Sequence, residues 1–171
     1  MLKQLPILPQ PWESISIDFI KQLPKSKGFT DILVIVDKLT KQVIFILTKR
    51  TIDTAGLAKV FIQQVFSKYR VPNYITSDRG SEFMLRFFCS LVNPLDIKLY
   101  FTLNYYPEAD DQTKHMNQML EQYLRIFCNY QQSDWACLLP LAEFTFNNTP
   151  SATMNMSLFF TNKDYHLKLE V

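Results

Sequence analysis

The strongest constraint on the fold is the segment 32–36, five consecutive apolar residues with the sequence Ile-Leu-Val-Ile-Val between Asp31 and Asp37. Its β-branched residues favour a strand, and its lack of alternation indicates burial on both faces. We therefore expect a central strand with a packed layer on each side. Because no apolar run approaches the ~20 residues that span a bilayer, we expect no membrane partner.

Two further segments have strand patterns. Residues 42–48 are rich in β-branched and aromatic residues. In residues 14–20 apolar and polar side chains alternate, which is typical of a half-buried strand. One face of that strand carries Ile15, Ile17 and Phe19, and the other carries Ser14, Ser16 and Asp18. Since short polar turns separate the three runs, we expect an antiparallel meander.

After Thr54 the apolar residues recur with a helical period, which predicts a helix to Tyr69 with Asp53 or Thr54 as its cap. The later patterns predict a strand at 73–77, a helix at 83–91, a strand at 97–102, a polar loop at 104–112, a helix at 113–130, and a helix after Ser133 that is kinked at Pro140. This order predicts an α/β domain, a five-stranded mixed sheet with helices on both faces.

Helix 113–130 has a clear division into two faces. Its apolar stripe, which we expect to be core, consists of Met116, Met119, Leu120, Tyr123, Phe127 and Tyr130. Its polar face consists of Lys114, Asn117, Gln118, Glu121 and Arg125. Two tryptophans, Trp12 and Trp135, are expected to anchor the core.

Length and composition narrow the classes of function only slightly. A chain of 171 residues suits one domain, and we expect a proline-rich linker or arm at 1–13, the domain at 14–150 and an irregular extension at 151–171. Three widely spaced cysteines and two histidines fit neither a disulfide framework nor a zinc clip, which favours a nuclear or cytoplasmic location. The net charge of +2 lacks the basic excess of a strong nucleic-acid binder.

Three acidic residues are candidates for chemistry by their placement. Asp18 lies on the polar face of the first strand, Asp78 ends a short strand before a glycine turn, and Glu82 opens a helix. Each also has an ordinary structural interpretation: a solvated edge residue for Asp18, a turn cap for Asp78 and a surface helix acid that suits the helix dipole for Glu82. These residues alone leave both interpretations open.

Several strings in the chain resemble the integrase catalytic core of gypsy-type LTR retrotransposons. They are WESISID at 12–18, ILVIVD at 32–37, TSDRGSEF at 76–83, EQYLR at 121–125 and LLPLAEF at 138–144, and the similarity covers residues 11 to about 166. The resemblance implies an RNase H-like fold and a reaction in which DNA 3′ ends are processed and joined to target DNA. It also implies two magnesium or manganese ions held by three carboxylates, since hard divalent cations take oxygen ligands.

The implied metal site is incomplete in this sequence. Asp18 matches the first carboxylate and Asp78 the second, but the third position, 36 residues after Asp78, is Lys114. The flanking residues match the family, so the register is secure. Because a lysine should attract the two aspartates and repel a dication, we expect weak or absent metal binding and impaired catalysis.

By resemblance the partners are DNA, both retrotransposon ends and target DNA, and a second copy of the chain. Asn117, Gln118 and Arg125 on the polar face of helix 113–130 are the expected DNA contacts, although an ordinary solvated face would look the same. Two alternative interpretations stay open: a non-enzymatic module for DNA binding or dimerisation, and a decayed transposon fragment without function.

Overall fold

The computed structural model describes residues 10–77, the helical residues 86, 87, 89 and 91, and residues 107–149, with the side chains of 107–112 excepted. Four strands form one mixed sheet: β1 (Ser14–Ile20), β2 (Asp31–Asp37), β3 (Val43–Thr48) and β4 (Tyr74–Ser77). The strand order is β3-β2-β1-β4, in which β4 is parallel to β1 and the other neighbours are antiparallel. The predicted fifth strand at 97–102 lies outside the described residues.

The four strand predictions that fall within the described residues are confirmed. All seven residues of β2 are buried, as expected for a strand covered on both faces. On one face of the sheet Ile15, Ile17, Leu33 and Ile35 belong to one hydrophobic cluster. On the opposite face Val34, Val36, Val43 and Phe45 belong to another. The sheet is therefore the middle layer of three.

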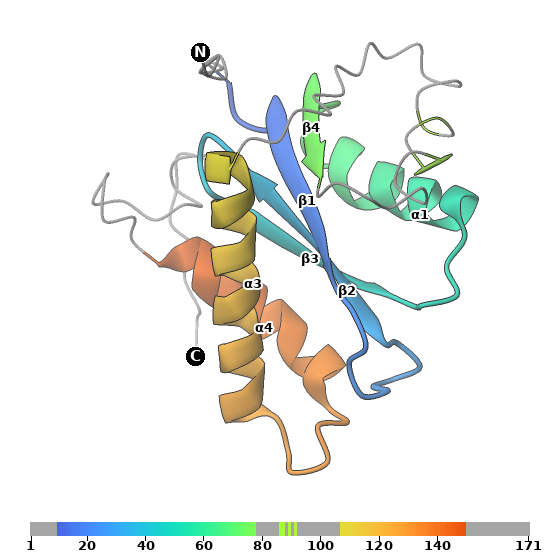
Figure 1. Ribbon diagram of the computed structural model, residues 1–171, viewed down its shortest axis with the longest axis vertical. Coiled ribbons are helices and arrows are strands. Elements are labelled where there is room, and N and C mark those ends of the chain that lie inside the picture. The colour runs from blue at the N-terminus through green and yellow to red at the C-terminus, as the bar shows by residue number, and fades with distance from the viewer. Residues whose placement is uncertain (1–9, 78–85, 88, 90, 92–106, 150–171) are drawn as a thin grey trace.

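Helices cover both faces (Figure 1). On the first face lie α1 (Thr54–Phe61) and the π-helical turn η1 (Ile62–Phe66), whose Leu57, Phe61 and Val65 are buried in the first cluster. On the other lie α3 (Pro107–Phe127) and α4 (Trp135–Asn148), which contribute Leu120, Leu124, Trp135 and Leu139 to the second cluster. The N-cap of α1 is Asp53, whose carboxylate accepts from the backbone N–H of Gly56 at 2.7 Å.

Three details of the helical predictions are wrong. The α-helix that begins at Thr54 ends at Phe61 and continues only as η1, short of Tyr69. Helix α3 spans 107–127, so that part of the predicted loop at 104–112 is helical. The outer part of its apolar stripe is exposed: Met119 by 37%, Phe127 by 58% and Tyr130 by 103%.

Both tryptophans are core anchors, as predicted. Trp12 is 2% exposed, stacks on Tyr69 with ring centroids 4.0 Å apart and donates to Gln42. Trp135 is 1% exposed and donates its indole N–H to the backbone carbonyl of Pro24 at 2.6 Å. Helix α4 continues on both sides of Pro140. None of the helices within the described residues is both long and apolar enough to cross a membrane.

Candidate functional site

The polar face of β1 is a contact surface for α3. The hydroxyl of Thr113 donates to the hydroxyl of Ser16 at 2.6 Å, and both side chains are buried. One helical turn later the side-chain amide of Asn117 donates to Oδ2 of Asp18 at 2.7 Å. The four residues from Thr113 to Asn117 advance ~6 Å along the helix, and the two residues from Ser16 to Asp18 advance ~6.6 Å along the strand. Because these two spacings match, both pairs of side chains can form hydrogen bonds at once. The pairs fix how α3 lies along β1.

Asp18 is a half-buried residue of an interior strand, since β1 lies between β2 and β4. Its Oδ1 accepts from the backbone N–H of Phe19 at 2.8 Å, and its Oδ2 accepts from Asn117. The interpretation of Asp18 as an edge residue is therefore wrong. An ordered, partly desolvated carboxylate facing a helix is the arrangement that a metal or proton site needs.

Asn117 has an unusual environment for a surface helix residue. Its Nδ2 is used on Asp18, while its Oδ1 is buried and has no hydrogen-bond partner. Buried side-chain acceptors are nearly always satisfied, so the amide is held for its bond to the carboxylate. The prediction that Asn117 contacts DNA stays a prediction, and the structure places its side chain against the sheet.

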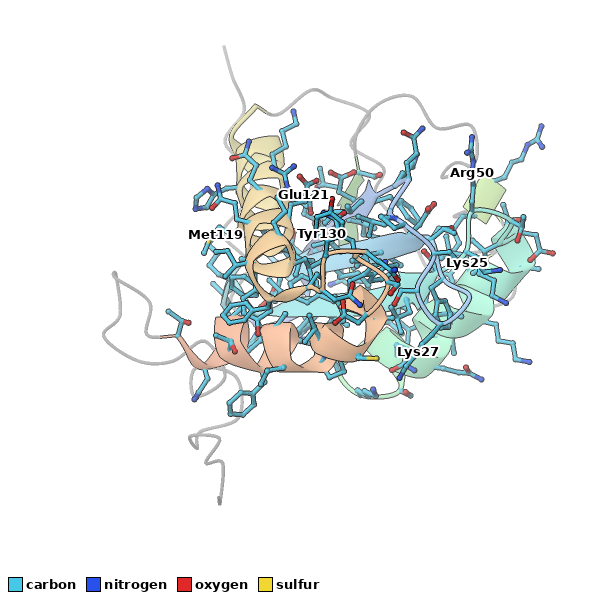
Figure 2. The ribbon with its side chains drawn as sticks, turned by 90° about the horizontal axis from the view of Figure 1, so that it is seen from below. Lys25, Lys27, Arg50, Met119, Glu121 and Tyr130 are labelled. Carbon is cyan, nitrogen blue, oxygen red and sulfur yellow. The ribbon has the colours of Figure 1, made fainter. Side chains whose placement is uncertain are left out.

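Lys114 lies directly after Thr113 in α3, and its side chain is exposed. Residues 114, 118, 121 and 125 are spaced three, four or seven apart and therefore share one face of the helix. On this face Arg125 pairs with Glu121 at 3.8 Å. Of the predicted DNA contacts, Gln118 and Arg125 thus belong to an exposed stripe, and Asn117 does not. Figure 2 shows Glu121 on α3, with Lys25, Lys27 and Arg50 across the molecule from that helix.

The second predicted carboxylate, Asp78, lies outside the described residues. Strand β4 ends at Ser77, whose register partner on β1 is Ile17. The next residue after Ser77 in the sequence is Asp78, and the next residue after Ile17 is Asp18. The predictions about Asp78 and about convergence of all three positions stay predictions.

Sequence reasoning missed Lys38, which follows the central strand. Its ammonium donates to the hydroxyl of Thr76 on β4. Burial, together with the nearby charge of Lys41, lowers the pKa of Lys38 to about 8. Its position two residues after the apolar run 32–36 was the available signal, since a lysine at the end of a buried strand must either extend into solvent or lie across the face of the sheet.

The chain is similar to known transposon polyproteins. It is 30% identical over 158 residues to the Tf2-3 and Tf2-4 transposon polyproteins of Schizosaccharomyces pombe. The match covers 92% of this chain and 12% of each polyprotein, so the chain spans a small part of these curated relatives. No family model matches the chain.

Solved structures decide the fold. The chain superimposes on a simian T-cell lymphotropic virus intasome in complex with PP2A regulatory subunit B56 gamma with a TM-score of 0.74 and 17% identity, covering 96% of this chain and 59% of that one. For the HTLV-2 integrase catalytic core in complex with magnesium (trimeric form), the TM-score is 0.68 at 15% identity, covering 90% and 98%. In sequence the chain is related to transposon polyproteins, and in fold it is an integrase catalytic core-like domain. The predicted RNase H-like fold is confirmed, and the gypsy type stays a prediction.

An integrase-like core of this kind is expected to hold divalent ions between three carboxylates. Within the described part of the chain, no group of three or more histidine, cysteine or acidic residues could hold a metal. One oxygen of Asp18 already accepts from Asn117. By the resemblance the third acid would stand at position 114, where this chain has a lysine. An ammonium donates hydrogen bonds and cannot ligate a cation, so in that register the residues do not fit a two-ion site of three acids, and the site assignment stays a prediction.

Proposed function

We propose that this domain is an integrase core that retains a DNA-facing helix and has lost efficient metal-dependent strand transfer. The observation that carries the proposal is the docking of α3 on β1 through the Thr113–Ser16 and Asn117–Asp18 hydrogen bonds. Position 114 directly follows Thr113 and precedes Asn117 by three residues, which supports the inference that it lies near Asp18, and the residue at 114 is a lysine.

Charge explains why this lysine should impair catalysis. Three carboxylates carry −3 and attract two dications, whereas Asp18, Asp78 and Lys114 together carry −1. Two unit charges ~4 Å apart interact by about 4 kcal/mol at an effective dielectric of 20. A lysine in the third position thus both removes an attraction and adds a repulsion for the metal. Magnesium or manganese binding should therefore be weak.

The test is a strand-transfer assay on oligonucleotides with the full chain, in magnesium and in manganese. We expect no product from the natural sequence. The matched charge reversal Lys27→Glu, at an exposed position away from α3, should give the same result. The Lys114→Glu variant should bind manganese more tightly than the natural sequence. Strand transfer by the natural sequence that disappears in Asp18→Asn would refute the loss of catalysis.

A second function is favoured by a different observation, the exposed stripe of Lys114, Gln118 and Arg125 along α3. A non-enzymatic DNA-binding module would need only such a face. Binding through phosphates weakens with salt, with a slope of about −0.9 for each phosphate neutralised. We expect salt-dependent retention of duplex DNA and a slope smaller by about one unit in Arg125→Ala. Absence of binding at low salt would eliminate this function and would favour a decayed fragment.

Self-association is supported by the apolar side chains at the far end of α3. Ile126 is 74% exposed, Phe127 58% and Tyr130 103%. Figure 2 shows Tyr130 near the end of that helix. Exposed apolar groups that gather on one helix end favour burial against another surface. Sedimentation of the purified chain should show a concentration-dependent dimer that is weakened by Phe127→Ser, and a monomer at all concentrations would rule this out.

A further inference from the structure

Basic side chains gather at the end of the sheet where β1 connects to β2 and where β3 ends. They belong to five exposed residues, which we name the basic end: Lys21, Lys25, Lys27, Lys49 and Arg50. Thr30 joins the two segments, because its N–H donates to the carbonyl of Thr48 at 3.2 Å and its hydroxyl accepts from the N–H of Arg50 at 3.0 Å. Figure 2 shows Lys25, Lys27 and Arg50 on one side of the molecule. Since the net charge of the whole chain is only +2, a local excess of positive charge lies at this end.

The acidic residues that flank the basic end in sequence are used within the fold. Asp31 is buried, and its Oδ1 accepts from the backbone N–H of Gln22 at 3.3 Å. Asp53 caps the N-terminus of α1. In the part of the chain that the structure describes, no member of the basic end forms an ion pair with a carboxylate. The positive charges of the basic end are therefore available to an anion from outside the domain.

Lys27 occupies the first central position of a tight turn, where its backbone is strained. Ser26 and Phe29 exchange two backbone hydrogen bonds, of 3.0 and 2.8 Å, around Lys27 and Gly28. Both central residues have a positive φ, 49° for Lys27 and 86° for Gly28, as a type I′ turn requires. Glycine adopts this conformation without strain, and asparagine is the preferred residue before it. The turn alone would favour another residue at position 27, so the exposed lysine suggests a role outside the fold.

The hairpin that carries this turn is held in place by the start of α4. The indole N–H of Trp135 donates to the carbonyl of Pro24 at 2.6 Å. Two residues along the hairpin, the hydroxyl of the buried Ser26 accepts from the N–H of Ala136 at 3.1 Å. The backbone of the hairpin is thus fixed before any ligand binds. A surface that is already ordered loses less conformational entropy on binding, which favours affinity.

We propose that the basic end binds the phosphate backbone of duplex DNA independently of base sequence, as a contact surface separate from the polar stripe of α3. Lysine and arginine side chains neutralise phosphates and position a protein on a duplex, whereas base edges carry the sequence information. This proposal goes beyond the proposed function, because none of the five residues belongs to the site around Asp18 or to the α3 stripe.

Two observations favour a duplex over a single strand or an acidic peptide. Proteins that bind single strands stack bases on aromatic rings. At the basic end the Phe19 and Phe29 rings instead lie beneath the ammonium groups of Lys21 and Lys49, at 5.7 and 6.0 Å from the ring centroids. Lys21 also lines a groove of about 260 Å³ together with Arg125 of α3. Basic groups thus extend from the hairpin to α3, and such an extended surface suits a rigid polyanion more than a short acidic peptide.

The experiment is a titration of a fluorescently labelled DNA duplex of mixed sequence with the full chain, followed by anisotropy at several salt concentrations. Loss of one phosphate contact lowers the salt slope by about one unit, and we expect this for Lys25→Ser and for Lys27→Asn. Lys27→Asn also supplies the residue that the turn prefers, so its melting temperature should equal or exceed that of the natural chain. The control Lys59→Ser removes the same charge at an exposed position of α1 and should leave the slope unchanged.

Arg125→Ala, measured beside these variants, separates this surface from the α3 stripe. A smaller slope in Arg125→Ala with unchanged slopes in Lys25→Ser and Lys27→Asn would overturn the proposal and leave DNA binding by α3 intact. Absence of duplex binding at low salt would overturn both.

Competition identifies the class of ligand. Unlabelled duplex should displace the labelled duplex more effectively than single-stranded DNA or poly-glutamate at equal concentration of charge. Displacement by poly-glutamate that is at least as effective would assign the basic end to acidic proteins and would overturn the assignment to DNA. A single strand that competes better than the duplex would also overturn it.

Discussion

Replacement of Asn147 by alanine should destabilise the domain strongly, because this side chain joins α4 to the edge of the sheet. Asn147 is 5% exposed, and its partner Val43 is 0% exposed. The substitution removes two hydrogen bonds of 2.8 Å and leaves a buried N–H and a buried C=O without partners. Each unsatisfied group costs ~1–3 kcal/mol, so with two such groups we expect a loss of ~2–6 kcal/mol in the free energy of unfolding.

Urea denaturation followed by circular dichroism measures this loss. The next residue, Asn148, provides a matched control of the same residue type on the same helix, and its side chain is only half buried. Asn148→Ala should change the free energy of unfolding by no more than ~0.5 kcal/mol. The reasoning is refuted if Asn147→Ala costs less than ~0.5 kcal/mol, or if both variants lose the same amount.

Three further predictions follow from the described contacts. Asp53→Ala removes the N-cap of α1 and should cost ~1 kcal/mol in urea denaturation, whereas an unchanged midpoint would show that the cap contributes nothing. The pKa of Glu143 is raised in the folded state, so this residue stabilises the fold fully below the pKa of an unfolded glutamate, and the stabilisation is lost as pH rises through the folded pKa. Glu143→Gln should abolish this pH dependence of the free energy of unfolding. Parallel pH–stability curves for the two proteins would contradict the prediction. Tyr130→Ser should leave the monomer's stability within ~0.5 kcal/mol, since its side chain is exposed, and a larger loss in the melting curve would mean that the ring is packed.

The sequence was sufficient for the strands because their signals are local. Alternation in β1 separates Ile15 and Ile17 from Ser16 and Asp18, and the two sets do face opposite layers. The unbroken apolar run of β2 is buried throughout. An alternating pattern indicates one buried face of a strand, and a continuous apolar run indicates two buried faces. These strands could therefore be predicted without knowing the rest of the fold.

The helix faces were harder to predict because they depend on partners far along the chain. The prediction of which face of α3 is buried used apolar residues alone. The side of the helix that contacts β1, however, carries Thr113 and Asn117, which form hydrogen bonds with polar residues of the strand. Phe127 and Tyr130, by contrast, are exposed. A polar strand face and a polar helix face can satisfy each other, and hydropathy does not reveal such a match.

The candidate site was predictable in part. The resemblance supplied Asp18, and the structure places it in an interior strand against α3. The bond from Asn117 to Asp18 spans 99 residues and those from α4 to β3 span 98 and 104. Contacts at such separations leave no periodic signal in one sequence. The contacts of Glu143 and Asn147 with β3 therefore emerged only from the structure.

We propose that Lys114 occupies the place of a metal-holding acid near Asp18, and calorimetric titration with manganese is the decisive measurement. We predict weak or undetectable binding to the natural chain, and binding at least ~10-fold tighter to Lys114→Glu, because the charge at this position changes from +1 to −1. The gain should disappear in the double variant with Asp18→Asn. Tight manganese binding by the natural chain, lost in Asp18→Asn and unaffected by Lys114→Glu, would contradict the account.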